Sequence, residues 1–306
     1  MKSLKIVVLL LCASLLPTIL AAQADNVTTY QSFNPQTGQN NLTQHILYRF
    51  PDPLRFGNGP FPLAMWIPGT IALYQDAFAQ IFVRQMAARG FVAASVEYSN
   101  TSLINQSCPD YTARAQGVFE AARSTSAVGV MCSFSRVNCG KGIVVSGISQ
   151  GGAMSVLAKN YAPQVQAVYA MSMGTFNSVG FINLSSCLAD GATVITPERL
   201  TIINGASDPA FVGQDPIMNL SGVTCDPGTF QCWSPTGSGG GWYIVKNSQV
   251  QDHSADHCYP LVGNCTSPFD FDHGWFYEAA NNWSLKPNLD WLATLGTQRV
   301  FSSNGQ

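Results

Sequence analysis

The sequence predicts an α/β fold, with a mostly parallel central sheet and helices on both of its faces. Short apolar runs bounded by turn residues alternate along the chain with segments of helical periodicity. Several runs are apolar throughout, which is typical of parallel strands buried on both faces. Residues 25–306 are long enough for one large domain with a substantial core. We therefore expect a single domain over that range.

The first 24 residues have the features of a secretory signal peptide. Lys2 and Lys5 precede an apolar run at 6–20, and residues 22–24 form a small-x-small cleavage site. The run is short and is broken by Pro17, so a membrane anchor fits less well. Later segments fall short of the roughly 20 apolar residues that a spanning helix needs. We expect the chain to be secreted and extracellular, without a transmembrane segment.

The expected elements follow in order from residue 43. Residues 43–50 alternate between apolar and polar and suit an antiparallel edge strand. Residues 173–197, between two strands, are expected to form a small cap insertion, and the Gly/Ser-rich stretch at 234–241 a loop. The expected strands cover 62–68, 91–98, 142–147, 165–172, 199–205 and 242–247, and the expected helices cover 76–90, 111–124, 151–162 and 287–296.

Composition excludes some partners. Charged residues make up 10% of the chain and the formal net charge is −2, so there is no basic surface for nucleic acid or anionic lipid. Glycans would help to keep so weakly charged a surface in solution, and we expect a glycoprotein. The Asn-x-Ser/Thr sequons lie at Asn26, Asn41, Asn100, Asn105, Asn183, Asn219, Asn264 and Asn282.

The cysteines predict disulfides. Once Cys12 leaves with the signal peptide, an even number remains, as is usual in exported chains. Three pairs share a spacing of seven residues and could each close a short loop, although eight cysteines allow 105 pairings. Zinc is the alternative, but the chain has no C-x-x-C pair. The expected bridges are Cys132–Cys139, Cys225–Cys232, Cys258–Cys265 and, by elimination, Cys108–Cys187.

The motif "GISQGG" at 147–152 places a serine between an expected strand and an expected helix. A nucleophilic Ser149 on a sharp turn needs neighbours without side chains, which Gly147 and Gly151 provide. The alternative is a Gly/Ser turn that fits by chance. With this strand–turn–helix context the chain resembles the α/β-hydrolase superfamily, over residues 63–295.

That resemblance implies a catalytic acid between the serine and the histidine in chain order. Asp208 directly follows an expected strand and would orient and stabilise the imidazole. An Asp-Pro turn is the structural alternative. Asp190 and Asp215 fit less well, because neither directly follows a strand.

The base is expected after the last strand, in "SQVQDHSADHCYP". We favour His257, because a Cys258–Cys265 bridge would hold its loop rigid. His253 lies closer to the end of the strand and stays open on position, and His273 is a third candidate. The two histidines with Asp252 and Asp256 could in principle bind zinc, but Pro260 and the missing glutamate argue for a loop. We expect no metal and no cofactor.

The resemblance also implies two backbone N–H donors for the oxyanion, from Gln150 and Thr70. The loop at 68–70 resembles that of secreted polyester hydrolases and cutinase-like esterases, and "GISQGG" is similar to the turns of cutinases and small carboxylesterases. These likenesses imply a serine hydrolase that cleaves carboxylic esters of uncharged, apolar substrates through an acyl-enzyme. A peptidase or acyltransferase would use the same triad, and an inactive glycosylated recognition protein is the alternative from another class.

The expected partner is a small-molecule or polymeric ester. The cap carries Phe176 and Phe181 but only Asp190 as a charge, which would favour an apolar group in the cleft. The two phenylalanines could equally belong to the core. Trp66 and Tyr74, on either side of the expected oxyanion loop, are further candidates to line the cleft, with strand core as the alternative for Trp66.

Overall fold

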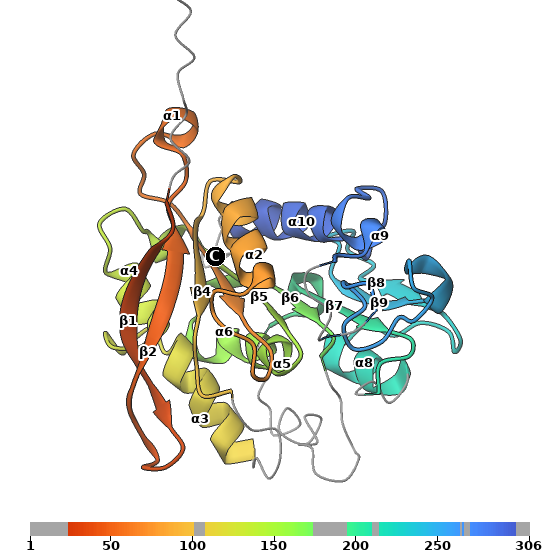
Figure 1. The fold of residues 1–306 in the computed structure, drawn as a ribbon, viewed down its shortest axis with the longest axis horizontal. Helices are drawn as coiled ribbons and strands as arrows, with labels where there is room; N and C mark the ends of the chain where they lie inside the picture. The colour runs from red at the N-terminus through yellow and green to blue at the C-terminus, as the bar shows by residue number, and fades with distance from the viewer. Residues whose placement is uncertain are drawn as a thin grey trace, which may run out of the picture.

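The structure, a computed structural model, describes residues 24–100, 108–173, 195–209, 214–263, 265 and 270–297. Over these residues the chain folds around one sheet of nine strands in the order β1-β2-β4-β3-β5-β6-β7-β9-β8 (Figure 1). The strands are β1 Asn26–Asn34, β2 Gln39–Arg49, β3 Leu63–Ile67, β4 Val92–Val96, β5 Ile143–Ile148, β6 Val165–Met171, β7 Leu200–Gly205, β8 Gln231–Trp233 and β9 Gly241–Val245.

The central strands, in the order β4, β3, β5, β6, β7 and β9, are parallel to one another. Strands β1, β2 and β8 run antiparallel to their neighbours. In Figure 1 the β1–β2 hairpin forms one edge of the sheet, in red, and β8 with β9 lies towards the other. Every residue of β3, β4 and β5 is buried, which explains their unbroken apolar sequences. A parallel sheet with helices on both faces and antiparallel edges is the α/β-hydrolase fold that the sequence predicted.

Helices cover both faces of the sheet. One core cluster packs Met65 and Val145 against α3 to α6, and the other packs Trp66 and Val144 against α2 and α10. Neighbouring strand residues thus point to opposite faces, as the pleat requires. The helices are α1 Pro53–Phe56, α2 Ala77–Ala87, α3 Cys108–Phe119, α4 Ala127–Cys132, α5 Gln150–Val156, α6 Ala158–Tyr161, α8 Gln214–Ser221, α9 His273–Phe276 and α10 Leu285–Thr297, with 3-10 turns η1 Cys139–Lys141, η2 Pro197–Arg199 and η3 Asn247–Gln249.

The strand order reverses direction between β3 and β5. From β3 the chain moves to β4 on one side, and from β5 it proceeds through β6 and β7 to β9 on the other. The carboxyl ends of β3 and β5 lie side by side, with Ile67 paired to Gly147. Open α/β sheets bind ligands outside the carboxyl ends of their strands at such a switch point.

Most expected elements are confirmed within a few residues, with three corrections. Residues 43–50 belong to β2, which is not an edge strand because β1 pairs with its outer side. The helix expected at 151–162 is divided at Leu157 into α5 and α6. The helix expected at 111–124 begins earlier and ends at Phe119.

The three disulfides with a spacing of seven residues are confirmed: Cys132–Cys139, Cys225–Cys232 and Cys258–Cys265. Cys187 lies outside the described residues, as does the side chain of Cys108, so their bridge stays a prediction. Residues 1–23 of the expected signal peptide and 174–194 of the expected cap also lie outside them. None of the described helices has both the length and the apolar character to cross a membrane.

Asp76 caps the start of α2 and generates a prediction about stability and pH. Its carboxylate accepts a hydrogen bond from Ala79 N at 2.8 Å, but burial raises its pKa to about 6. The folded state therefore holds this proton more tightly than the unfolded state, so stability falls as pH rises from about 4 to about 6. Asp76→Asn should stabilise the chain more at pH 8 than at pH 4, by on the order of 2 kcal/mol in urea unfolding. An equal effect at the two pH values would contradict this.

Candidate active site

Ser149 lies alone between the end of β5 and the start of α5, with a left-handed backbone of φ 57° and ψ −125°. L-residues rarely adopt this conformation. A Cβ atom on Gly147 would lie 2.5 Å from Gly151 O, and one on Gly151 would lie 2.1 Å from Ile67 O. The close approach of strand, turn and helix therefore requires both glycines, and it leaves the Ser149 side chain partly exposed at the carboxyl end of β5.

Three residues chosen from the sequence come together here. His257 Nε2 lies 2.8 Å from Ser149 Oγ, and His257 Nδ1 lies 2.9 Å from both Asp208 Oδ1 and Oδ2. The Asp208 side chain is 0% exposed, whereas that of His257 is 25% exposed. This row of contacts can move a proton from the serine hydroxyl to the imidazole while the carboxylate holds the ring in place.

The loops that carry Asp208 and His257 are joined to each other. Ser207 N donates to Ala255 O at 2.8 Å, and Asn247 Oδ1 accepts from Ala255 N and from Ser207 Oγ, both at 2.9 Å. A Cβ atom on Gly205 would lie 2.1 Å from Ala255 O, so the two loops are in backbone contact. Our sequence reasoning missed Asn247, although its place at the end of the last expected strand was a signal.

The other candidate histidines lie elsewhere. His253 is exposed, with a left-handed φ of 59°, and its backbone N–H donates to Val250 O. His273 is exposed at the start of α9, and its ring lies 5.2 Å from that of Tyr277. Within the described part of the chain neither makes a hydrogen bond to Ser149, and no group of three or more His, Cys, Asp or Glu side chains is placed to hold a metal ion.

Asp256 directly precedes His257 and carries charge close to it. Burial raises its pKa, the Cys258 N–H that it accepts lowers it, and the carboxylates of Asp252 and Asp208 raise it again. Asp256 therefore loses its negative charge at a higher pH than a solvated aspartate does.

The loop expected to hold one oxyanion donor packs directly on Ser149. A Cβ atom on Gly69 would lie 3.2 Å from Ser149 Cβ, and Thr70 is the next residue. Asn100 Nδ2 donates to Gly69 O at 2.7 Å and to Ala72 O at 2.9 Å, and Ile71 N donates back to Asn100 O. The buried Asn100, which sequence reasoning treated only as a sequon, thus fixes this loop.

The other expected donor, Gln150, is the first residue of α5 and is held from behind. Tyr111 OH donates to Gln150 O at 2.5 Å, and Tyr98 OH donates to Pro68 O at 2.9 Å and to Gln150 Oε1 at 3.2 Å. Burial raises the pKa of both tyrosines, so they remain neutral donors. Tyr98 therefore links the loop before Thr70 to the turn after Ser149.

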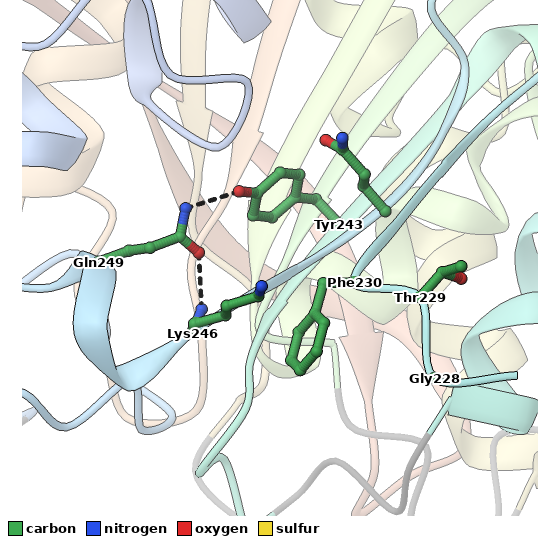
Figure 2. Close-up of a pocket in the computed structure, with 7 residues that line it drawn as sticks. Gly228, Thr229, Phe230, Tyr243, Lys246 and Gln249 are labelled. Carbon is green, nitrogen blue, oxygen red and sulfur yellow. Dashed lines mark hydrogen bonds between the residues drawn. The ribbon is translucent and has the colours of Figure 1, made fainter.

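A separate hollow of about 420 Å³ lies beside the end of β9 (Figure 2). Lys246 Nζ lies 4.2 Å from the centre of the Phe230 ring, and Gln249 bonds to Tyr243 OH and to Lys246 N. The lining of this hollow includes none of the residues around Ser149. The lining residues are Gly228, Thr229, Phe230, Gln231, Tyr243, Lys246 and Gln249.

No protein-family model matches the sequence, and no curated protein matches it. Similar solved structures include esterase Est22, 16% identical with a TM-score of 0.40 over 61% of this chain and 66% of that one. A lipase/esterase from Lactobacillus plantarum is 13% identical, with a TM-score of 0.45 over 64% and 83% of the two chains. The 2,6-dihydroxy-pseudo-oxynicotine hydrolase is 15% identical, with a TM-score of 0.47 over 88% and 68%. This chain spans just under two thirds of Est22.

The disulfide after His257 can be tested against a matched one. Cys258–Cys265 and Cys225–Cys232 close loops of equal length, so the loss of either should lower the free energy of unfolding by about 2–3 kcal/mol. Only Cys258 adjoins His257. Replacing Cys258 and Cys265 by serine should slow the reaction of Ser149 with a fluorophosphonate about tenfold, because the imidazole is held less firmly. The same replacement of Cys225 and Cys232 should not, and equal rates in the two variants would contradict this.

Proposed function

We propose that this chain is a serine hydrolase that cleaves carboxylic esters. The observation that carries the proposal is the row of contacts from Asp208 through His257 to Ser149, with the serine on a left-handed turn. Its place at the switch point of the sheet, where such folds bind ligands, agrees with this. An inactive recognition protein would not need a serine in this strained backbone, so the intact row favours an enzyme.

The first half of the reaction forms an acyl-enzyme. Ser149 Oγ attacks the ester carbonyl carbon while His257 Nε2 takes the hydroxyl proton. The carbonyl oxygen becomes an oxyanion, which the backbone N–H groups of Thr70 and Gln150 would stabilise. Asp208 stabilises the imidazolium. The bond to the alcohol oxygen then breaks, and the alcohol leaves with the proton from His257.

The second half releases the acid. Water takes the place of the alcohol, His257 removes its proton, and the resulting hydroxyl attacks the acyl carbon. The second tetrahedral intermediate collapses as His257 returns a proton to Ser149 Oγ. The carboxylic acid departs, and the free enzyme is restored.

We further propose that the enzyme works outside the cell on uncharged, apolar esters. Three disulfides fit an oxidising compartment, and a chain with 10% charged residues offers little to a charged substrate. Trp66 does not contribute to this preference, because it is buried in the core against Phe78 and Phe82. Phe176 and Phe181 lie outside the described residues.

The purified chain should hydrolyse p-nitrophenyl butyrate, and Ser149→Ala and His257→Ala should each lower kcat by on the order of 10³-fold or more. His253→Ala is the matched control, since it removes an exposed imidazole four residues away, and should retain activity within about twofold. A loss in His253→Ala but not in His257→Ala would make His253 the base.

Labelling by a fluorophosphonate and hydrolysis of two further substrates distinguish the alternatives. Both an esterase and a peptidase should label at Ser149 and can turn over an activated p-nitrophenyl ester. The two are therefore separated by comparing an unactivated ethyl ester with a peptide p-nitroanilide: an esterase should cleave the first and a peptidase the second. If the wild-type chain and Ser149→Ala behave alike in labelling and in hydrolysis, the chain is not a serine hydrolase.

A further inference from the structure

Two large apolar side chains stand in solvent directly after the loop that packs on Ser149. Ile71 is 77% exposed and Leu73 is 57% exposed. Scattered exposed apolar residues are normal on a protein surface, but the described residues include only four other large ones. Two of the six thus lie within three residues of each other, beside the nucleophile.

The backbone of Ile71 adds a second, independent observation. Its φ is 55°, which is unfavourable for a β-branched residue and which glycine or asparagine would adopt more readily. The conformation is held by Asn100, whose carbonyl accepts from Ile71 N at 3.2 Å and whose side chain binds the residues on either side. Ile71 gains no burial in return for this strain. Backbone strain of this kind collects at ligand-contacting sites.

The position of Ile71 relative to the nucleophile follows from chain geometry. A Cβ atom on Gly69 would lie 3.2 Å from Ser149 Cβ, and consecutive Cα atoms are about 3.8 Å apart, so Ile71 Cα lies no more than about 7.6 Å from Gly69 Cα. A hydrocarbon chain attached to a carbonyl at Ser149 can therefore reach this surface within a few bonds.

We propose that Ile71 and Leu73 form an apolar wall that receives the hydrocarbon chain of the ester and gives the enzyme a preference for long chains. This inference rests on the proposed function and names the residues that set its specificity. Covering the two side chains removes apolar surface from water, which favours a long chain over a methyl group. The acyl chain and the alcohol chain are the two sources of such a group.

Two variants test the wall, Ile71→Asn and Leu73→Asn. Asparagine tolerates the left-handed backbone, so Ile71→Asn removes the apolar surface without adding strain. One arm compares p-nitrophenyl octanoate with p-nitrophenyl acetate, and the other compares octyl acetate with ethyl acetate, all below micelle-forming concentrations. In one arm kcat/KM for the long ester should fall about tenfold more than for the short one, and that arm identifies the chain that the wall contacts.

Leu54→Asn is the control, because Leu54 is also highly exposed but lies near the amino end of β4, away from the carboxyl ends of the strands. Its helix α1 places Phe56 beside Gly90, just before β4 begins, whereas Ser149 follows the end of β5. This variant should keep the chain-length preference of the wild type. Thermal unfolding checks each fold, and Ile71→Asn should melt no lower than the wild type because the strain is relieved.

The outcomes distinguish a failure of the apolar wall from a failure of the proposed esterase activity. If kcat/KM of the two wall variants falls equally for long and short esters, or falls for neither, the apolar wall is contradicted while the proposed esterase activity stands. Should Ile71→Asn fail to fold, Leu73→Asn alone decides. A wild-type chain that turns over none of the four esters overturns the proposed function itself.

Discussion

The left-handed backbone at Ser149 is the constraint on which the rest of the site depends. A residue held there costs on the order of 1–3 kcal/mol, so the surroundings must impose it. They do so through the hydrogen bonds from Ser149 N to Met171 O and from Ala153 N to Ser149 O, and through the close contact of Gly151 with Ile67 O. A side chain at residue 151 would push helix α5 away from strand β3. The position of the loop after β3 is thereby set relative to the serine.

The sheet brings the loops to one edge, but polar side chains fix their final positions. Tyr98 and Asn100 come from the segment after β4 and hold the loop that contains Thr70. Asn247, after β9, joins the loops of Asp208 and His257. Apart from the side-chain bond between Ser207 and Asn247, each of these bonds satisfies a backbone group that lies outside the strands, where ladder hydrogen bonds no longer serve. A site made of loops can therefore be as well ordered as the strands beneath it.

The sequence predicts those parts of the structure that are determined by residues close together along the chain, and it fails where contacts between distant segments decide. The buried strands and the turn at Ser149 were predictable, because apolar runs and closely spaced glycines record constraints within a few residues. Strand β1 was missed since its mostly polar sequence becomes a strand only by pairing with β2. The choice between His253 and His257 depends on contacts between distant loops. His253 has a left-handed backbone, and it is His257 whose ring lies against Ser149 Oγ, which no local pattern encodes.

Asn100 shows why a short motif needs its structural context. The sequence marks it as a sequon, equivalent to those at Asn26 and Asn282. Those two are exposed, whereas Asn100 is 8% exposed and its amide nitrogen donates to both Gly69 O and Ala72 O. A glycan on that nitrogen would remove one donor and would need space that the packed loop does not provide. In the folded chain Asn100 therefore serves the loop beside Ser149, and a glycan can be accommodated only at exposed sequons.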